Sequence, residues 1–231
     1  MTNIKQFPPN TVGKDYVVGD IHGCFTRLLL ALDAIHFNSA QDRLFSVGDL
    51  VDRGPESHLV LDWIAKPWFH AVRGNHEDML INWFNKDYSS YSPYDYHSNG
   101  GDWFIYPKLG HTKDFSGTFE FQEAIATALA CLPIAIQVPV GNYTVGIIHA
   151  GSPTNDWLDL NAPLNAQKLE FALWDRSCLQ YKDKSLIKNI DLVIVGHTPL
   201  LEVQKFGNTL FIDSGAYQGK PFKVLEIAKL L

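Results

Sequence analysis

The sequence has little cysteine, no long apolar run and no cluster of basic residues, and each absence excludes a class of protein. Cys24, Cys131 and Cys178 are widely spaced, odd in number and form no CxxC pair, which argues for reduced thiols and against a disulfide framework. No segment approaches the roughly 18 consecutive apolar residues that suggest a membrane span. The net charge is -6, without a run of Lys or Arg, so we expect no nucleic-acid partner.

The composition that remains is that of a globular protein. With 46% hydrophobic and 13% aromatic residues among 231, the chain can bury a large core, and we expect a single domain over residues 1–231. The first residues, MTNIKQFPPNTVGKDY, contain no apolar targeting stretch. We therefore expect a cytoplasmic protein with no membrane partner. The oligomeric state stays open.

The first third of the chain alternates between strand and helix patterns. Short apolar runs predict strands over residues 16–19, 43–48 and 69–74, and helical spacing predicts helices between and after them, over 59–64 and 77–84 among others. The apolar face of the first helix is expected to consist of Phe25, Leu28, Leu29, Leu32 and Ile35. This alternation predicts parallel strands with helical crossovers.

The periodicity fails between residues 87 and 117, where the stretch DYSSYSPYDYHSNGGDWFIYP is rich in Tyr, Ser and Gly. We expect a lid-like insertion there, because irregular segments of this length are usually functional loops. Its tyrosines are expected to pack the insertion against the body, with stacking on a base or a substrate side chain as the alternative. They are Tyr88, Tyr91, Tyr94 and Tyr96.

The second half of the chain contains a helical pattern over residues 121–132 and then mostly strand patterns. Turn dipeptides at Gly141-Asn142 and Gly207-Asn208 separate β-branched runs, which predicts antiparallel hairpins. The whole chain is thus expected to be an α/β sandwich of two mixed β-sheets flanked by helices.

Polar side chains gather where the expected strands end. YVVGDIHG, LFSVGDLVDRG, HAVRGNHE, YTVGIIHAG and LVIVGHT each lead from an apolar stretch into one to three polar residues beside a glycine. These polar residues are Asp20, His22, Asp49, Asp52, Arg53, Arg73, Asn75, His76, His149 and His197. Ligands of open α/β sheets bind outside the carboxyl ends of the strands. We therefore expect these side chains to meet at one site.

Six of these side chains have the composition of a metal site. Two Asp, one Asn and three His offer oxygen and imidazole nitrogen without a thiolate, which suits Mn, Fe or Zn better than Ca. Six ligands are too many for one open catalytic metal and about right for two, if a carboxylate bridges them. We expect two divalent ions, Mn²⁺ first, with Fe or Zn as alternatives. Arg53 and Arg73 lie near these ligands in sequence, and guanidinium groups bind phosphate oxygens in pairs.

In this order, GDIHG, GDLVDRG, RGNHE, HAG and GHT make the chain similar to the phosphoprotein-phosphatase branch of the calcineurin-like metallophosphoesterases. The chain most resembles the small bacterial and bacteriophage-lambda-type serine/threonine phosphatases, from Asp15 to about Ile227. GDLVDRGP together with RGNHE is highly specific, whereas GHT or HAG alone is weak. The fold of that family, two sheets with helices outside, agrees with the pattern of elements above.

The resemblance implies which residues bind metal. Asp20 and His22 would bind the first ion, and Asp49 would bridge both ions. The second ion would be bound by Asn75, His149 and His197. Asn75 has a second interpretation, because it stands just before EDMLINWF and could cap that helix.

The resemblance also implies the catalytic and phosphate-binding residues. His76 would be the general acid that protonates the leaving oxygen, and Asp52 would hold its imidazole in the right tautomer. Trp174-Asp175-Arg176 stands where related phage enzymes have a WNR-like motif. Arg176 would therefore join Arg53 and Arg73 in binding phosphate.

Three functions are compatible with this pattern. The first is hydrolysis of phosphoserine and phosphothreonine, with phosphotyrosine as a further substrate, by direct attack of a metal-activated water. The second is symmetrical hydrolysis of diadenosine tetraphosphate; the relatives that do this share GDIHGC, GDLV and HAG but lack an Asp at the position of Asp52. GDLVDRG therefore favours a phosphorylated protein or a small phosphate ester as substrate. A non-catalytic scaffold is the third, and the presence of all six ligands, His76 and Asp52 argues against it.

Overall fold

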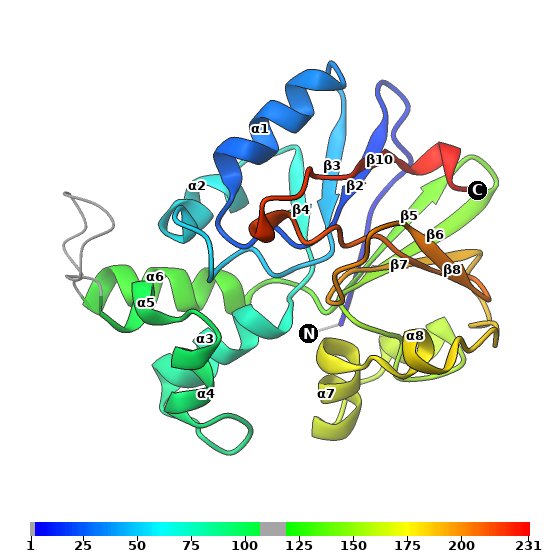
Figure 1. Ribbon diagram of the computed structural model, residues 1–231. Helices are drawn as coiled ribbons and strands as arrows, with labels where there is room; N and C mark the ends of the chain where they lie inside the picture. Colours follow the sequence, from blue (N-terminus) through cyan, green and yellow to red (C-terminus); the bar gives the residue numbers. More distant parts are fainter. Residues whose placement is uncertain (1–2, 107–118) are drawn as a thin grey trace.

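The computed structural model describes residues 3–106 and 119–231, and the strands in these ranges form two sheets (Figure 1). The four-stranded sheet has the order β10 (Val224–Glu226), β2 (Asp15–Val18), β3 (Arg43–Ser46) and β4 (Phe69–Ala71). The six-stranded sheet has the order β1 (Ile4–Gln6), β5 (Ala135–Val140), β6 (Tyr143–Ile148), β7 (Leu192–Val195), β9 (Thr209–Phe211) and β8 (Gln204–Phe206). The second part of the predicted lid, residues 107–117, lies outside the described ranges.

Both sheets are mixed, as the sequence predicts. β2, β3 and β4 are parallel, and β10 adds to β2 in the antiparallel sense. The hairpins predicted from the two Gly-Asn turns are present as the antiparallel pairs β5–β6 and β8–β9. The six-stranded sheet is less antiparallel than expected, however, because β6, β7 and β9 run parallel to one another and β1 runs parallel to β5.

Helices cover the outer faces of the two sheets (Figure 1). Outside the insertion, the described helices are α1 (Phe25–Ala34), α2 (Val60–Ile64), α3 (Asn75–Asn85), α6 (Phe119–Ala130), α7 (Ala166–Trp174) and α8 (Ser177–Tyr181). Four 3-10 helices cover Ser57–Leu59, Trp157–Asn161, Ala216–Gln218 and Ile227–Lys229. The first part of the insertion forms α4 (Pro93–Ser98) and α5 (Asp102–Ile105). Within the described ranges, no helix combines the length and the apolar character needed to cross a bilayer.

Three buried clusters hold these layers together. Val17, Phe45, Ile147 and Ile194 belong to the cluster that joins residues of the two sheets. A second cluster joins residues of the four-stranded sheet to α1, α2, α3, α6 and the insertion, and a third joins residues of the six-stranded sheet to α7. Strands that are covered on both faces read as continuous apolar runs, which is why β2, β3 and β7 could be recognised in the sequence.

Some elements differ from the prediction. The prediction lacks β1, α7 and α8. The two helices have weak apolar patterns, because only Ala172 and Leu173 of α7 are buried and α8 buries no residue. On α1, Phe25, Leu28 and Leu32 are buried as expected, whereas Leu29 is 48% exposed. The apolar stripe of this helix is therefore narrower than its sequence indicates.

Candidate active site

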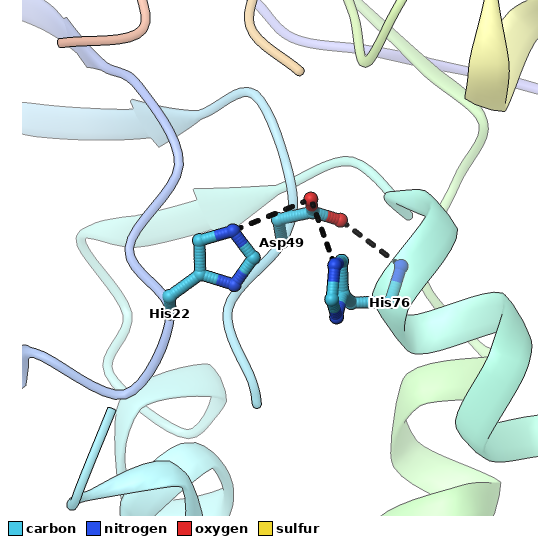
Figure 2. Close-up of side chains that lie close together, drawn as sticks. All are labelled: His22, Asp49 and His76. Atoms are coloured by element: carbon cyan, nitrogen blue, oxygen red, sulfur yellow. Dashed lines mark hydrogen bonds and ion pairs between the residues drawn. The ribbon is translucent and has the colours of Figure 1, made fainter. Parts of the chain in front are cut away.

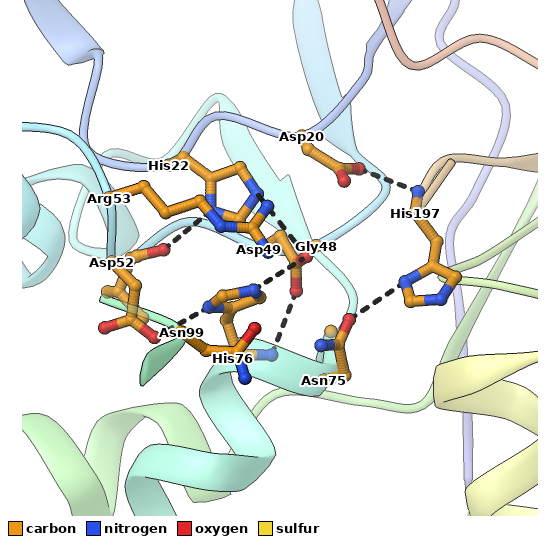
Figure 3. Close-up of polar contacts among 12 residues, drawn as sticks. Asp20, His22, Gly48, Asp49, Asp52, Arg53, Asn75, His76, Asn99 and His197 are labelled. Atoms are coloured by element: carbon orange, nitrogen blue, oxygen red, sulfur yellow. Dashed lines mark hydrogen bonds and ion pairs between the residues drawn. The ribbon is translucent and has the colours of Figure 1, made fainter. Parts of the chain in front are cut away.

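The carboxyl ends of strands from both sheets converge on one buried site. Asp20, Asp49 and Asn75 follow β2, β3 and β4, while His149 and His197 follow β6 and β7. Figure 3 shows Asp20, His22, Asp49, Asn75, His76 and His197 pointing toward one another across this edge. None of these side chains, nor His149, belongs to a residue more than 6% exposed. The six predicted metal ligands are thus brought together by the topology.

Asp49 lies at the centre of the site (Figure 2). Its Oδ2 is 3.6 Å from Nε2 of His22 and 4.0 Å from Nε2 of His76, and its Oδ1 is 3.5 Å from Nε2 of His149. Two groups of residues have ligand atoms that all lie within 4.8 Å of one another, and Asp49 belongs to both. They are His22, Asp49 and His76, and Asp49, His149 and His197. A carboxylate shared by two groups is what a bridging ligand requires.

Asn75, His149 and His197 bring three ligand atoms together on one side of Asp49. Oδ1 of Asn75 is 2.8 Å from Nε2 of His149 and 3.0 Å from Nδ1 of His197, and the two nitrogens are 3.1 Å apart. Asn75 is the first residue of α3, but the N-cap of that helix is Gly74. The capping interpretation of Asn75 is therefore wrong, and its side chain faces the histidines instead.

The histidine tautomers fit metal ligation. Nδ1 of His149 donates to the carbonyl of Val47 at 2.8 Å, and Nδ1 of His22 donates to the carbonyl of Val51 at 3.0 Å. In each ring the unprotonated Nε2 then faces Asp49. Burial lowers the pKa of His22 and of His149, and it lowers the pKa of His197 to about 2. Neutral rings with lone pairs turned toward a carboxylate are the form that binds a divalent cation.

Two further buried carboxylates, those of Asp20 and Asp213, belong to the site. Oδ1 of Asp20 accepts a hydrogen bond from the backbone N–H of His197 at 3.0 Å. Burial and then the charges of Asp213 and Asp49 raise the pKa of Asp20. Asp213 is 2% exposed, and its Oδ2 has no hydrogen-bond partner among the described residues. Buried carboxylates that repel one another are stabilised by a bound cation, so the donor set fits divalent metal.

Asp52 and His76 form a buried pair beside these ligands. Nδ1 of His76 lies 2.7 Å from Oδ2 of Asp52, and both side chains are fully buried. Burial lowers the pKa of His76, but the charge of Asp49 and the hydrogen bond to Asp52 outweigh it, so the pKa is raised. Nε2 of His76 is buried and has no hydrogen-bond partner among the described residues. It is the ring atom free to carry a transferable proton.

The three predicted phosphate-binding arginines lie in different surroundings. Nη1 of Arg53 is 2.8 Å from Nε2 of His22, at the centre of the site, and its guanidinium stacks over the ring of Tyr217. Arg176 precedes α8, is exposed, and its charge lowers the pKa of His149 and His197. The guanidinium of Arg73 donates to the carbonyl of Ala130 and lies 3.5 Å from Asp78. Arg73 is therefore engaged with α6 and α3.

Glu77 ties the strand ends together beneath the site. Its carboxylate accepts from the backbone N–H groups of Gly74 at 2.7 Å, Asp49 at 2.9 Å and Leu50 at 2.7 Å. Gly48 has φ +101°, and a Cβ there would stand 2.8 Å from the nitrogen of Gly74. The loop after β3 and the start of α3 are thus held in close contact, which aims Asp49 into the site.

The backbone of the site is unusual in its dihedral angles. Nine of the described non-glycine residues have positive φ, a region that side chains other than Gly rarely adopt. Five of them belong to the site: His22, Asp49, Asp52, Arg53 and His197. Strained residues of this kind cluster at functional sites. The loops that carry the ligands are therefore fixed by their surroundings and not by local preference.

Comparison with known proteins identifies the family. The family profile described as Calcineurin-like phosphoesterase matches residues 16–208, which include every residue of the site except Asp213 and Tyr217. The chain belongs to this family. Calcineurin-like phosphoesterases use divalent metals, in agreement with the Asp and His groups around Asp49. The protein is therefore a metal-dependent phosphoesterase.

Several relatives in this family are named phosphatases. The chain is 36% identical to serine/threonine-protein phosphatase 1 of Salmonella typhimurium, over 92% of this chain and 91% of the relative. It is 35% identical to serine/threonine-protein phosphatase 2 of Escherichia coli, with 87% of each chain covered. A symmetrical bis(5'-nucleosyl)-tetraphosphatase of Actinobacillus pleuropneumoniae is 47% identical, but over only 29% of this chain and 25% of the relative.

A solved structure of a proposed diadenosine tetraphosphatase has the same fold. Its TM-score is 0.62 at 22% sequence identity, with 98% of both chains covered. This likeness confirms the predicted calcineurin-like sandwich of two mixed sheets.

Sequence reasoning missed three parts of the site. Asp213 follows the apolar run of TLFIDSG, which has the same pattern of apolar strand, carboxylate and glycine as the predicted ligands, so a signal was present. Glu77 lies within RGNHE but acts through backbone contacts, which residue type alone does not reveal. Trp103 and Tyr96, which contact Asp52, lie in the segment without periodicity.

Proposed function

We propose that this protein is a dinuclear-metal phosphomonoesterase that hydrolyses phosphoserine and phosphothreonine, with phosphotyrosine as a further substrate. The observation that carries the proposal is the buried Asp52–His76 pair at 2.7 Å, which lies beside Asp49, the carboxylate that two potential ligand groups share, one of them with His76. Ligand groups alone would fit a metal-binding protein. A protonated imidazole next to them adds the group that a phosphate-ester hydrolase needs for its leaving alcohol.

Under this proposal the two metals would be held by residues from both sheets. Asp20 and His22 would hold the first, Asp49 would bridge, and the second would be held by Asn75, His149 and His197. When bound, two divalent cations would polarise the phosphoryl oxygens and lower the pKa of an attacking water. Mn²⁺ is our first choice for both sites, with Fe or Zn as alternatives. Because neither sheet carries a complete ligand set, we treat residues 1–231 as one domain.

His76 would supply the proton for the leaving group. Asp52 accepts from Nδ1, so the second proton of the imidazolium is on Nε2 and faces Asp49. The charge of Asp49 and the hydrogen bond to Asp52 raise the pKa of His76 and so favour its protonated form. As the P–O bond breaks, Nε2 would donate to the seryl or threonyl oxygen, which would otherwise leave as an unstable alkoxide. The ring then returns to its neutral form, still held by Asp52.

Arginines would hold the phosphate during this step. Arg53 is the best placed, because its guanidinium already lies against His22 and is supported by the ring of Tyr217. Arg176 would approach from the α8 side. Arg73 would contribute only if its contacts with Ala130 and Asp78 were exchanged for phosphate oxygens. The cytoplasmic location stays a prediction from the sequence.

Symmetrical hydrolysis of diadenosine tetraphosphate is the second candidate. It is supported by the 47% identity to a tetraphosphatase, although this covers only 68 residues. The phosphatase relatives cover 87% or more of this chain, which favours phosphorylated protein or a small phosphate ester. Tyr88 and Tyr94 of the insertion are exposed and would be the first candidates for stacking on adenine.

The test is a direct competition between the two substrate classes. The purified protein would be loaded with Mn²⁺, and kcat/KM would be measured for a phosphothreonine peptide and for diadenosine tetraphosphate. We expect the peptide to be preferred by at least about tenfold, a difference of about 1.4 kcal/mol in transition-state binding. A preference for the dinucleotide would replace the first proposal by the second. If metal binds but neither substrate nor an activated aryl phosphate is hydrolysed, the non-catalytic scaffold would be the remaining interpretation.

A further inference from the structure

Asp52 has a second set of hydrogen bonds, which come from the insertion. While its Oδ2 faces His76, its Oδ1 accepts from Nε1 of Trp103 at 2.7 Å and from Oη of Tyr96 at 3.3 Å. Tyr96 belongs to α4 and Trp103 to α5. The two oxygens of this fully buried carboxylate are thus divided between the catalytic histidine and the insertion.

Packing holds Tyr96 and the turn that precedes Trp103 close to Asp52. Tyr96 is 1% exposed and lies in the cluster with Phe104, against Trp83. Gly100, with φ +98°, brings the insertion so close to the Asp52–Arg53 turn that a Cβ would stand 2.8 Å from the nitrogen of Arg53. Burial and then the charge of Asp52 raise the pKa of Tyr96, so its hydroxyl stays protonated and remains a donor. The insertion is therefore part of the wall of the site.

Fixed donors on one carboxylate oxygen restrict the other. A carboxylate held by only one partner can rotate about its Cβ–Cγ bond and change the angle at which it meets the imidazole. With Oδ1 held by an indole and a phenol, Oδ2 keeps one direction toward Nδ1 of His76. Outer partners of this kind commonly affect activity by about 10- to 100-fold without touching the substrate.

We propose that Trp103 and Tyr96 are positioning residues for proton donation, acting on His76 through Asp52. This inference rests on the proposed role of His76 as the general acid. Under this inference the insertion does more than cover the site. It affects the rate of hydrolysis of substrates whose leaving group needs a proton. We expect Trp103 to have the larger effect on proton donation, because its hydrogen bond to Asp52 is the shorter of the two.

The test uses substitutions that remove single donors. Trp103→Phe removes the indole N–H and Tyr96→Phe removes the hydroxyl, and each retains an aromatic ring. Trp83→Phe is the matched control, since Trp83 packs in the same cluster against Tyr96 and Phe104. Each variant would be loaded with Mn²⁺, checked for metal content and melting temperature, and assayed with a phosphothreonine peptide and with p-nitrophenyl phosphate.

The two substrates separate positioning from general damage. The alcohol of phosphothreonine needs a proton to leave, whereas p-nitrophenolate is a stable anion. For Trp103→Phe we expect kcat on the peptide to fall about 10- to 100-fold with KM changed less than about twofold, and kcat on the aryl phosphate to fall less than about threefold. Tyr96→Phe should show the same pattern at about 3- to 10-fold. Equal losses on both substrates would overturn the proposal.

A double-mutant cycle identifies the route of the effect. In a His76→Asn background, Trp103→Phe should cause no further loss on the peptide, because the indole acts only through His76. Full additivity would overturn the inference and leave the role of His76 intact. If His76→Asn alone leaves peptide hydrolysis unchanged, the proposed general acid itself fails. Should Trp103→Phe not fold, the same cycle with Tyr96→Phe decides.

Discussion

The two sides of Asp49 differ in what surrounds their buried polar atoms. On the side of Asp52, one carboxylate is held by three donors, from His76, Trp103 and Tyr96. On the side of Asn75, one amide oxygen and two ring nitrogens lie within 3.1 Å of one another. In the first arrangement each oxygen of the Asp52 carboxylate has a matching donor. In the second, Nε2 of His149 is an acceptor that faces another acceptor.

This contrast separates two kinds of chemistry in one small site. Under the proposed function, acceptors that cannot pair with one another would bind a cation, whereas a histidine held by a carboxylate would donate a proton. Asp49 touches both sides, through His76 and through His149.

Removing Asp49 should abolish the contrast, since both ligand groups depend on it. For Asp49→Ala we expect metal content to fall below one ion per chain and turnover to fall by more than about four decades, beyond the range of general acid catalysis alone. Elemental analysis and a phosphothreonine assay measure the two quantities. Asp33→Ala, an exposed position on α1, is the control. Two ions retained per chain would exclude a bridging role.

Substituting one histidine from each side tests the contrast itself. His76→Asn should lower kcat by about two to four decades and leave the metal content unchanged. His149→Ala should lower the metal content as well, because it removes a ligand next to Asn75 and His197. Parallel elemental analysis of the two variants decides. If both lose metal to the same degree, His76 is a ligand and the two sides are alike.

Arg53 lies next to His22. Loss of the Arg53 side chain should weaken substrate binding. A charge-assisted pair with phosphate is worth about 1.5–3 kcal/mol, so Arg53→Ala should raise KM or the inhibition constant of phosphate by about 10- to 100-fold. Arg73→Ala should have a smaller effect, because its guanidinium is already bound to Ala130 and close to Asp78. Phosphate inhibition curves of the two variants provide the measurement. An unchanged constant for Arg53→Ala would remove it from the phosphate site.

His70 is a half-buried histidine outside the site, and it tests whether a histidine pKa is lowered there as well. Its ring packs against Phe7 and Phe45, and burial and then the charges of Lys5 and Arg43 lower its pKa from 6.5 to about 4. The unfolded chain takes up this proton near pH 6.5 and the folded chain only near pH 4, so the stability contributed by neutral His70 is lost as pH falls between these values.

The expected effect is about 1 kcal/mol, reduced from the full linkage value because the ring is partly exposed. Urea unfolding at pH 7 and pH 5 would measure it. His70→Gln should remove about this much of the loss in stability between the two pH values, whereas His36→Asn, at an exposed position, should keep the wild-type loss. An identical loss in His70→Gln and wild type would contradict the assignment.

The sequence predicts the convergence of the proposed metal ligands, but not the hydrogen bonds that orient the side chains of the site. Asp20, Asp49, His149 and His197 stand at strand ends, and the topology of parallel strands alone brings such positions to one edge. The ring of His149 is oriented by the carbonyl of Val47, and the ring of His22 by the carbonyl of Val51. Backbone partners of this kind have no signature in residue type, so the tautomers could not be predicted.

The insertion shows why the rest was missed. Trp103 and Tyr96 reach Asp52 over sequence separations of 51 and 44 residues, and no local pattern marks them. The prediction that the insertion's tyrosines pack against the body holds for Tyr96, which is 1% exposed, but not for Tyr94, which is 73% exposed. Both lie within α4, and only the packing of that helix distinguishes them.

The left-handed backbone at His22, Asp49, Asp52, Arg53 and His197 has a consequence for how this protein can evolve. Each such residue is destabilised by about 1 kcal/mol relative to glycine. Exchange for glycine would relieve this backbone cost, but it would also empty buried positions such as that of Asp52, whose carboxylate holds three donors. Selection therefore cannot remove the backbone strain at these five positions without giving up the side chains that we propose for turnover.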